Sequence, residues 1–347
     1  MAAVPIAIDS ADDPRIAEFR DIRERDLTGR DNRFVAEGTV VLRMLADAHA
    51  QDRGFSAEKI LLLRNRVDGV LPILERLPGR CAGLCRRGRC FSTASSVSIC
   101  IAAFSRSGRR EDRGEAALLD ALPERALVLV GCGISNHDNA GSMFRNAAAF
   151  RADAVLLDET CCDPLYRKAL RVSVGSVLSV PYRRGGKALD VLLALAERGF
   201  AIWTLSPHGE TDIRAIPASA RMALVVGTEG EGLPEALLAR FQSARIPQSE
   251  ELDSLNAATA TGIAFVFHGF RDEAFLRSQC WGSAMIAAAR SARLTRSPEV
   301  FSAASGNSER IGDDGPSLSA VSATMLAAIE AISSRIAPSR PVTVFAF

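Results

Sequence analysis

The chain has 347 residues, of which 48% are hydrophobic and 24% are charged, and its formal net charge at pH 7 is +1. That length allows two domains, and the composition is ordinary for a soluble globular protein. The charge does not indicate a nucleic-acid-binding protein, although a local basic face is enough for one. The sequence lacks both a transmembrane-length apolar run and a signal-peptide pattern, so we expect a cytoplasmic protein with no membrane partner.

Residues 13–78 have the pattern of a small α/β unit. Apolar periodicity predicts helices from Asp13 onward, over 40–48 and over 70–77, and strands over 34–36 and 59–63. Five arginines follow the first helix: Arg20, Arg23, Arg25, Arg30 and Arg33. Acidic residues interleave with them, which is typical of a solvated charged face. Phosphate contacts are the alternative, since guanidinium suits phosphate well.

Residues 79–110 interrupt this regularity, being rich in Cys, Ser and Arg. We consider the hypothesis that they are out-of-frame or strongly diverged sequence with poorly defined local structure. A basic RNA-contacting surface is the alternative. Four of the eight cysteines cluster around this stretch, namely Cys81, Cys85, Cys90 and Cys100. They lack paired C-x-x-C spacing and a nearby histidine, so we expect free thiols and no metal.

Residues 111–123 are expected to be a linker with a short helix, and a regular pattern begins at Arg125. Strands are predicted over 127–130, 154–157, 177–180, 201–205 and 223–226. Helices are predicted over 142–150, from Asp163-Pro164 to Arg171, over 188–197 and over 254–267. This alternation predicts a largely parallel α/β sheet. Residues 269–347 are rich in Ser, Ala and Arg, and we expect a poorly ordered tail there.

A glycine-rich loop follows the last of these strands, with Gly227, Gly230 and Gly232 in G-x-x-G-x-G spacing. Glycines allow backbone to approach a ligand closely. The spacing matches neither the phosphate-binding Walker loop nor the dinucleotide fingerprint, which follows the first strand of its domain. The loop therefore indicates a ligand site but makes a nucleotide-dependent dehydrogenase a poor interpretation.

Two further polar stretches accompany the loop. In 136–146, a polar loop precedes a helix, Asn139 lies near the helix start, and Arg145 points away from the packed face. Arg145 is then either a solvated surface residue or a cation held where α/β sheets bind ligands. In 254–262, Ser254 is a candidate N-cap, Asn256 in the first turn offers an amide to a ligand, and small residues follow.

These three stretches occur in the order NHDNAGSMFRNAAAF, LVVGTEGEGLP and RIPQSEELDSLNAATATGIA. Together they resemble the motifs of the SpoU (TrmH-type) RNA methyltransferases of the SPOUT superfamily, over about residues 125–268. The resemblance implies a trefoil-knotted parallel-sheet domain over 124–268, preceded by a small α/β RNA-binding domain over 13–110. It also implies S-adenosylmethionine as cofactor, a homodimer, and methyl transfer to a ribose 2′-hydroxyl of structured RNA. The N-terminal unit favours ribosomal over transfer RNA.

The resemblance also assigns residues. The implied catalytic set is Asn139, Arg145, Glu229, Ser254 and Asn256. The implied donor-binding set is Gly227, Thr228, Gly230, Gly232, Ile246, Leu255, Asn256 and Ala258. The candidate RNA contacts are Arg23, Arg30, Arg33 and Arg145. Arginine is a poor base because it stays protonated, so we expect Arg145 to position the substrate and stabilise charge.

Two departures from the family pattern flank this site. Arg151 follows Phe150 where the family usually has glycine, and Gln248 stands where it commonly has methionine. Two alternatives remain open at this stage. One is a non-catalytic RNA-binding or ribosome-assembly module that retains the fold, and the other is methylation of transfer RNA.

Overall fold

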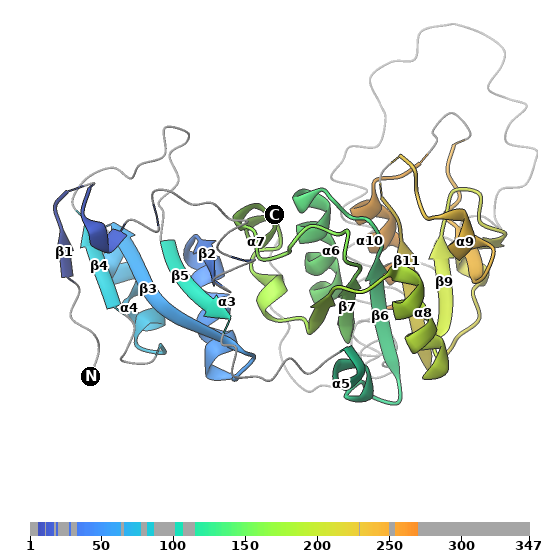
Figure 1. Ribbon diagram of the computed structural model, residues 1–347, viewed down its shortest axis with the longest axis horizontal. Helices are drawn as coiled ribbons and strands as arrows, with labels where there is room; N and C mark the ends of the chain where they lie inside the picture. The colour runs from blue at the N-terminus through green and yellow to red at the C-terminus, as the bar shows by residue number, and fades with distance from the viewer. Residues whose placement is uncertain are drawn as a thin grey trace, which may run out of the picture. The chain divides into compact units, whose positions relative to one another are not determined.

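The computed structural model describes residues 6–10, 12–16, 19, 28, 33–63, 66–77, 82–86, 101–106, 115–228, 230–249 and 254–269. Two β-sheets are present in these residues, a five-stranded sheet before residue 107 and a seven-stranded sheet after residue 115 (Figure 1). Arg23, Arg30, Glu229, the side chains of the cysteine cluster and the tail beyond Gly269 lie outside the described residues.

The five-stranded sheet is mixed and has the order β1-β4-β3-β5-β2. Its strands are β1 (Ile6–Ile8), β2 (Arg33–Glu37), β3 (Phe55–Leu63), β4 (Ala82–Arg86) and β5 (Ile101–Arg106). It is accompanied by a short 3₁₀ helix (Pro14–Ile16) and by α3 (Thr39–Ala50) and α4 (Val67–Leu74). The buried faces of Phe34, Leu42, Leu45 and Ile60 supply its core. The predicted strands and helices over 34–77 are thus confirmed, with shifts of a few residues at their ends.

Strands β4 and β5 fall inside 79–110, so the hypothesis of poorly defined local structure is wrong for those two segments. β4 pairs in parallel with both β1 and β3, and β5 pairs antiparallel with both β2 and β3. Each strand is therefore hydrogen-bonded along both edges. Pairing of this kind depends on neighbours distant in sequence, and strand preference is strongly dependent on such context.

The seven-stranded sheet has the order β10-β12-β9-β11-β6-β7-β8, and every neighbouring pair is parallel. Its strands are β6 (Ala126–Gly131), β7 (Ala154–Leu157), β8 (Tyr182–Arg184), β9 (Ala201–Leu205), β10 (Thr211–Asp212), β11 (Arg221–Val226) and β12 (Gln242–Arg245). Its helices are α5 (Glu115–Asp120), α6 (His137–Ala149), α7 (Arg167–Val172), α8 (Ala188–Glu197), α9 (Glu235–Leu238) and α10 (Ala257–His268). The prediction of a parallel α/β sheet is confirmed.

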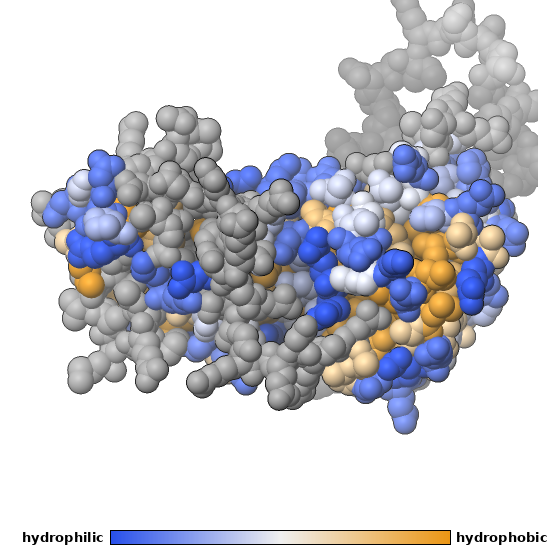
Figure 2. All heavy atoms as spheres, viewed as in Figure 1, coloured by the Kyte–Doolittle hydropathy of each residue, from blue (hydrophilic) through white to orange (hydrophobic). Residues whose placement is uncertain are grey.

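Both faces of this sheet are covered by helices. Along β6, Leu127 and Leu129 pack into one core with α6 and α10, whereas Val128 and Val130 pack into the other with α5, α8 and α9. This alternation follows from the two-residue period of a strand, and burial on both faces explains the continuous apolar run of β6. Apolar side chains also reach the surface over α8 and α9, where Leu189, Leu238 and Phe241 are only partly buried (Figure 2).

One predicted strand is wrong. Residues 177–180 begin in a 3₁₀ helix (Ser176–Leu178), and the strand β8 comes only after Pro181. Val177 and Leu178 are fully buried, so the run is apolar for reasons of packing. A short buried run cannot be assigned to helix or strand from its periodicity. The helix expected from Asp163 starts later, at Arg167, because the Asp163 carboxylate accepts from Leu165 N and forms a turn instead.

The residue that follows helix α6 and its C-cap is in a conformation that usually requires glycine. Arg151 has φ +55°, in the left-handed region. The family's usual residue at this position is glycine, which adopts such angles without strain. This departure from the family pattern therefore has a local backbone cost.

Within the described residues, no helix has the length and hydropathy needed to span a membrane.

Gly141 sets the distance between α6 and α7. A Cβ at this position would lie 2.6 Å from the carbonyl oxygen of Ala169 and 2.9 Å from Cβ of Val172. We expect Gly141→Ala to destabilise the protein by about 1–3 kcal/mol, because overpacking against backbone forces the helices apart. Thermal unfolding measures this effect. Gly69→Ala in α4, where the added methyl meets no atom within 4 Å, is the control, and an equal melting temperature for both variants would contradict the prediction.

Candidate active site

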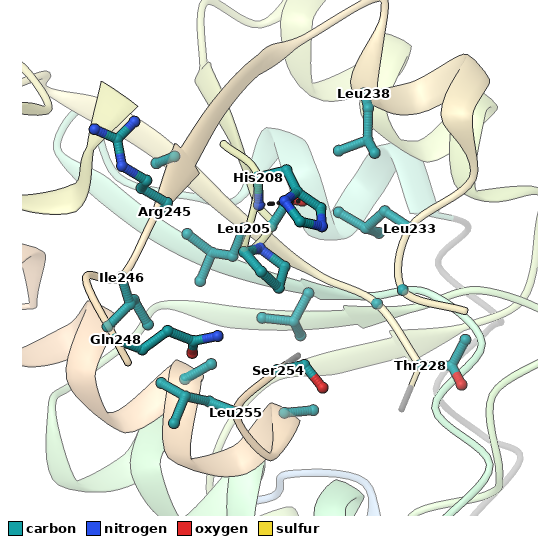
Figure 3. Close-up of a pocket in the computed structure, with 18 of the residues that line it drawn as sticks. Leu205, His208, Thr228, Leu233, Leu238, Arg245, Ile246, Gln248, Ser254 and Leu255 are labelled. Carbon is teal, nitrogen blue, oxygen red and sulfur yellow. Dashed lines mark hydrogen bonds between the residues drawn. The ribbon is translucent and has the colours of Figure 1, made fainter. Parts of the chain in front are cut away.

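A pocket opens at the carboxyl ends of β9, β11 and β12, where parallel α/β sheets bind ligands (Figure 3). Its volume of about 860 Å³ suits a small molecule. Apolar side chains supply much of the wall, namely Leu205, Val226, Leu233, Leu238, Ile246 and Leu255. Polar groups come from the glycine loop, from 206–208 and from Arg245, Gln248, Ser249 and Ser254.

The glycine loop is folded tightly upon itself. Gly232 N donates to Thr228 O over 3.2 Å, and a Cβ on Gly227 would lie 2.4 Å from the carbonyl carbon of Gly232. Gly230 and Gly232 have φ of +93° and +72°, which side chains rarely adopt. The loop conformation therefore depends on all three glycines, and it presents backbone atoms to the pocket.

A second loop, residues 206–210, is fixed against β12. Ser206 N donates to Ala244 O over 3.0 Å, and the Arg245 guanidinium donates to the carbonyl oxygens of Gly209 and Glu210 over 2.8 and 2.7 Å. A Cβ on Gly209 would lie only 2.3 Å from Ala244 C. These contacts direct the Arg245 side chain away from the pocket and hold the loop at its edge (Figure 3).

His208, at the tip of that loop, is a pocket residue that sequence reasoning missed. Its ring lies between Leu205 and Leu233 in Figure 3. Among the described lining residues it has the one aromatic ring, and it can also hydrogen-bond. The available signal was its position, since the Ser-Pro-His-Gly turn directly follows a predicted strand and so lies at the carboxyl edge of the sheet.

The polar stretch before the expected 142–150 helix is itself helical. α6 begins at His137, and Asn136 is its N-cap, its Oδ1 accepting from Asp138 N over 2.9 Å. Asn139 is consequently in the first turn and is buried, with 6% of its surface exposed. Arg145 is exposed, whereas its neighbour Phe144 is fully buried. The prediction that Arg145 points away from the packed face is confirmed.

Asn256 joins the first and third motifs. It is the N-cap of α10 in place of the predicted Ser254, and its Oδ1 accepts from Ala258 N and Thr259 N over 2.9 and 3.2 Å. Its Nδ2 donates to Asn139 Oδ1 over 2.9 Å. The helix start thus binds directly to α6, across 117 positions of sequence.

The structure brings most of the proposed donor residues together. Six of them line the pocket, namely Gly227, Thr228, Gly230, Gly232, Ile246 and Leu255, and Ser254 of the predicted catalytic set lines it too. Asn256 and Ala258 lie beside it on α10, whereas Ala257 and Ala260 contribute to the wall. Arg33, a candidate RNA contact, forms an ion pair with Glu58, with 2.9 Å between Nη2 and Oε2.

Asp158 supports the chain just before α6. This buried carboxylate accepts from Gly133 N over about 3.1 Å, from Thr160 N and Cys161 N over 3.0 Å, and from the Thr160 hydroxyl over 2.7 Å. Burial raises the pKa of the Cys132 thiol to about 12, and Asp158 adds to the shift. Cys132 therefore stays protonated at neutral pH. Across the described ranges, His, Cys, Asp and Glu form no group of three suited to a metal ion.

The sequence around this site is similar to that of known RNA methyltransferases. The model of the SpoU rRNA Methylase family matches residues 126–266. A Mycobacterium tuberculosis protein, described as an uncharacterized tRNA/rRNA methyltransferase, is 35% identical over 275 residues, which cover 73% of this chain and 88% of that protein. The chain belongs to the SpoU family of RNA methyltransferases. The expectation that it is an RNA-methylating enzyme is confirmed.

Two further proteins are similar to this chain, one in sequence and one in fold. A 23S rRNA (guanosine-2′-O-)-methyltransferase of Salmonella typhimurium is 28% identical over 213 residues, or 59% of this chain and 87% of the relative. The fold is similar to that of an AdoMet-bound rRNA methyltransferase from Sinorhizobium meliloti, with a TM-score of 0.60 and 23% identity. That match covers 75% of this chain and 96% of the other.

Proposed function

We propose that this SpoU enzyme transfers a methyl group from S-adenosylmethionine to a ribose 2′-hydroxyl of RNA, with ribosomal RNA as the substrate. One observation carries the proposal. The hydrogen bond between Asn256 and Asn139 joins the start of α10, which borders the pocket, to α6, which carries Arg145. A small-molecule pocket and an exposed cation are therefore placed on two directly bonded helices.

The pocket residues fit S-adenosylmethionine by size and chemistry. Leucine and isoleucine side chains suit the apolar faces of the adenosine rings. The backbone N–H and C=O groups around Gly227 and Gly230 suit the polar atoms of the same ligand. The Sinorhizobium meliloti relative holds AdoMet in a similar fold, which supports this assignment. When bound, S-adenosylmethionine supplies an electrophilic methyl group on a sulfonium centre.

The residues on α6 and α10 then act on the RNA. Arg145 holds a phosphate next to the target ribose and stabilises charge as the 2′-oxygen bonds to the methyl carbon and the carbon–sulfur bond breaks. A guanidinium is a poor general base, so another group accepts the hydroxyl proton. We assign that role to Glu229, and we assign Ser254 and Asn256 to holding the ribose.

The domain organisation belongs to the same proposal. Residues 13–110 bind RNA, 111–123 link them to the methyltransferase domain at 124–268, and the knot lies in that domain. The pairing of β11 with both β9 and β6, and the contact of α10 with α6, support a single domain over 124–268. Ribosomal RNA is favoured by the name of the Salmonella typhimurium relative.

A homodimer is the expected assembly, because the last turn of α10 exposes two large apolar side chains. Val266 is 57% exposed and Phe267 is 48% exposed. We expect Phe267→Glu to shift the protein from dimer to monomer in sedimentation velocity, since a charge at an apolar interface is costly. Val40→Glu, at a similarly exposed valine of α3, should remain dimeric. A monomeric wild type would contradict the prediction.

Methyl transfer itself tests the proposed function. The protein is incubated with [methyl-³H]S-adenosylmethionine and either ribosomal or transfer RNA, and modified riboses are mapped by primer extension at low dNTP. We expect label in ribosomal RNA and a stop at one position. Label in transfer RNA alone would mean that transfer RNA, and not ribosomal RNA, is the substrate. Binding of RNA without methyl transfer would favour a non-catalytic RNA-binding module.

A further inference from the structure

The first turn of α10 serves both halves of the site. Leu255, Ala257 and Ala260 line the pocket, whereas Asn256 between them turns to Asn139 on α6. A shift of this turn by a fraction of an ångström would therefore change the pocket wall directly. Buried side chains such as Ala264 and Phe265 pack α10 into the core, and polar contacts at its start add a directional constraint on that first turn.

A second contact supplies that constraint. Asn146 Nδ2 on α6 donates to the carbonyl oxygen of Ala258 over 2.8 Å, and the contact is partly buried. Asn139 and Asn146 are seven residues apart, or about two helical turns, so they lie on the same face of α6. The two asparagines thus hold α10 at its N-cap and at its second residue.

The packing around Asn146 leaves room for this amide and little else. A Cβ built on Gly262, one turn further along α10, would lie 3.3 Å from Asn146 Nδ2. Because Gly262 has no side chain, the amide can reach Ala258 O between the helices. The acceptor is a carbonyl, so the amide nitrogen is the atom that faces it.

We propose that Asn146 is a positioning residue of the donor pocket, which it shapes by fixing the start of α10 through Ala258. The inference rests on the proposed function, since it takes the pocket ligand to be S-adenosylmethionine. Asn146 itself is outside the pocket lining, and Arg145 beside it is exposed on another side of α6. Loss of the contact therefore affects the donor and leaves RNA contacts in place.

Calorimetric titration of the full-length protein with S-adenosylmethionine and with S-adenosylhomocysteine tests this role. We expect Asn146→Ala to bind both about fivefold more weakly, the size of one lost hydrogen bond. Asn146→Asp keeps the shape of the side chain but places a carboxylate next to the carbonyl oxygen of Ala258, and the two oxygens repel. This variant should therefore bind both compounds more weakly still. In kinetics, the donor KM should rise while RNA affinity is unchanged. Ala149→Ser, exposed on the same helix, is the control.

Gly262→Val distinguishes positioning from general damage to the fold. The valine displaces the Asn146 amide, so it should weaken donor binding in the wild type and weaken it less when Asn146 is already alanine. Equal losses in both backgrounds, or donor binding by Asn146→Ala within twofold of the wild type, would overturn the inference. A wild type that binds neither compound would instead overturn the proposed function.

Discussion

Arg145→Ala is expected to lower the rate of methyl transfer by about 100-fold or more, the usual effect of removing one charge-stabilising donor from a transition state. Arg145 is exposed on α6, and its neighbours Phe144 and Ala147 carry the packing. Substitution should therefore leave the melting temperature and the donor affinity unchanged. The measurements are single-turnover transfer to RNA, thermal unfolding and donor titration.

Two matched variants sharpen this result. Arg145→Lys keeps the charge but lacks the planar fork that binds phosphate in two places, so it should recover only part of the rate. Arg240→Ala removes an exposed arginine from the same domain and should transfer methyl groups at the wild-type rate. If Arg145→Ala and Arg240→Ala reacted equally fast, Arg145 would have no role in the reaction.

Gly227→Ala is expected to weaken S-adenosylmethionine binding by about tenfold or more, because a methyl forced against backbone costs about 1–3 kcal/mol. The added Cβ would lie 2.4 Å from Gly232 C and 2.6 Å from Leu233 N, so the loop must open. That movement displaces the backbone that lines the pocket. RNA binding should be retained, since α6 is unaffected.

Calorimetry with the donor and gel shift with RNA separate these two effects. Gly69→Ala is again the control, because its methyl meets open space on α4. Its donor affinity should equal that of the wild type. Donor binding by Gly227→Ala as tight as that of the wild type would contradict the prediction. It would show that the pocket does not depend on the tight conformation of the glycine loop.

The sequence predicted the central strands of the second sheet well, because β6, β7, β9 and β11 are buried on both faces. β7 and β9 and helix α8 match their predicted bounds, since long apolar runs there alternate with helical periods. Prediction from sequence is wrong where strand pairing is non-local or where an apolar run is short. β4 and β5 depend on strands distant in sequence, and the apolar residues Val177 and Leu178 lie in a 3₁₀ helix.

For the candidate site, too, the sequence predicted some features and missed others. Composition and spacing indicated a ligand loop, and the family resemblance supplied Asn139, Arg145 and Asn256. The hydrogen bond from Asn256 to Asn139, and that from Asn146 to Ala258, come from the packing of α6 against α10. A linear sequence does not report such packing. His208 was missed because one histidine in a turn has no pattern of its own.

The alternation along the start of α10 limits how this enzyme can be re-engineered for a larger methyl-donor analogue. Leu255 lines the pocket while the next residue, Asn256, is hydrogen-bonded to α6, so enlarging the cavity there would also disturb the contact with the helix that carries Arg145. Leu205, Leu238 and His208 line the same cavity from outside α10 and carry no such second duty among the contacts described. A widened donor specificity should therefore be sought by trimming those three side chains, with residues 254–262 kept intact.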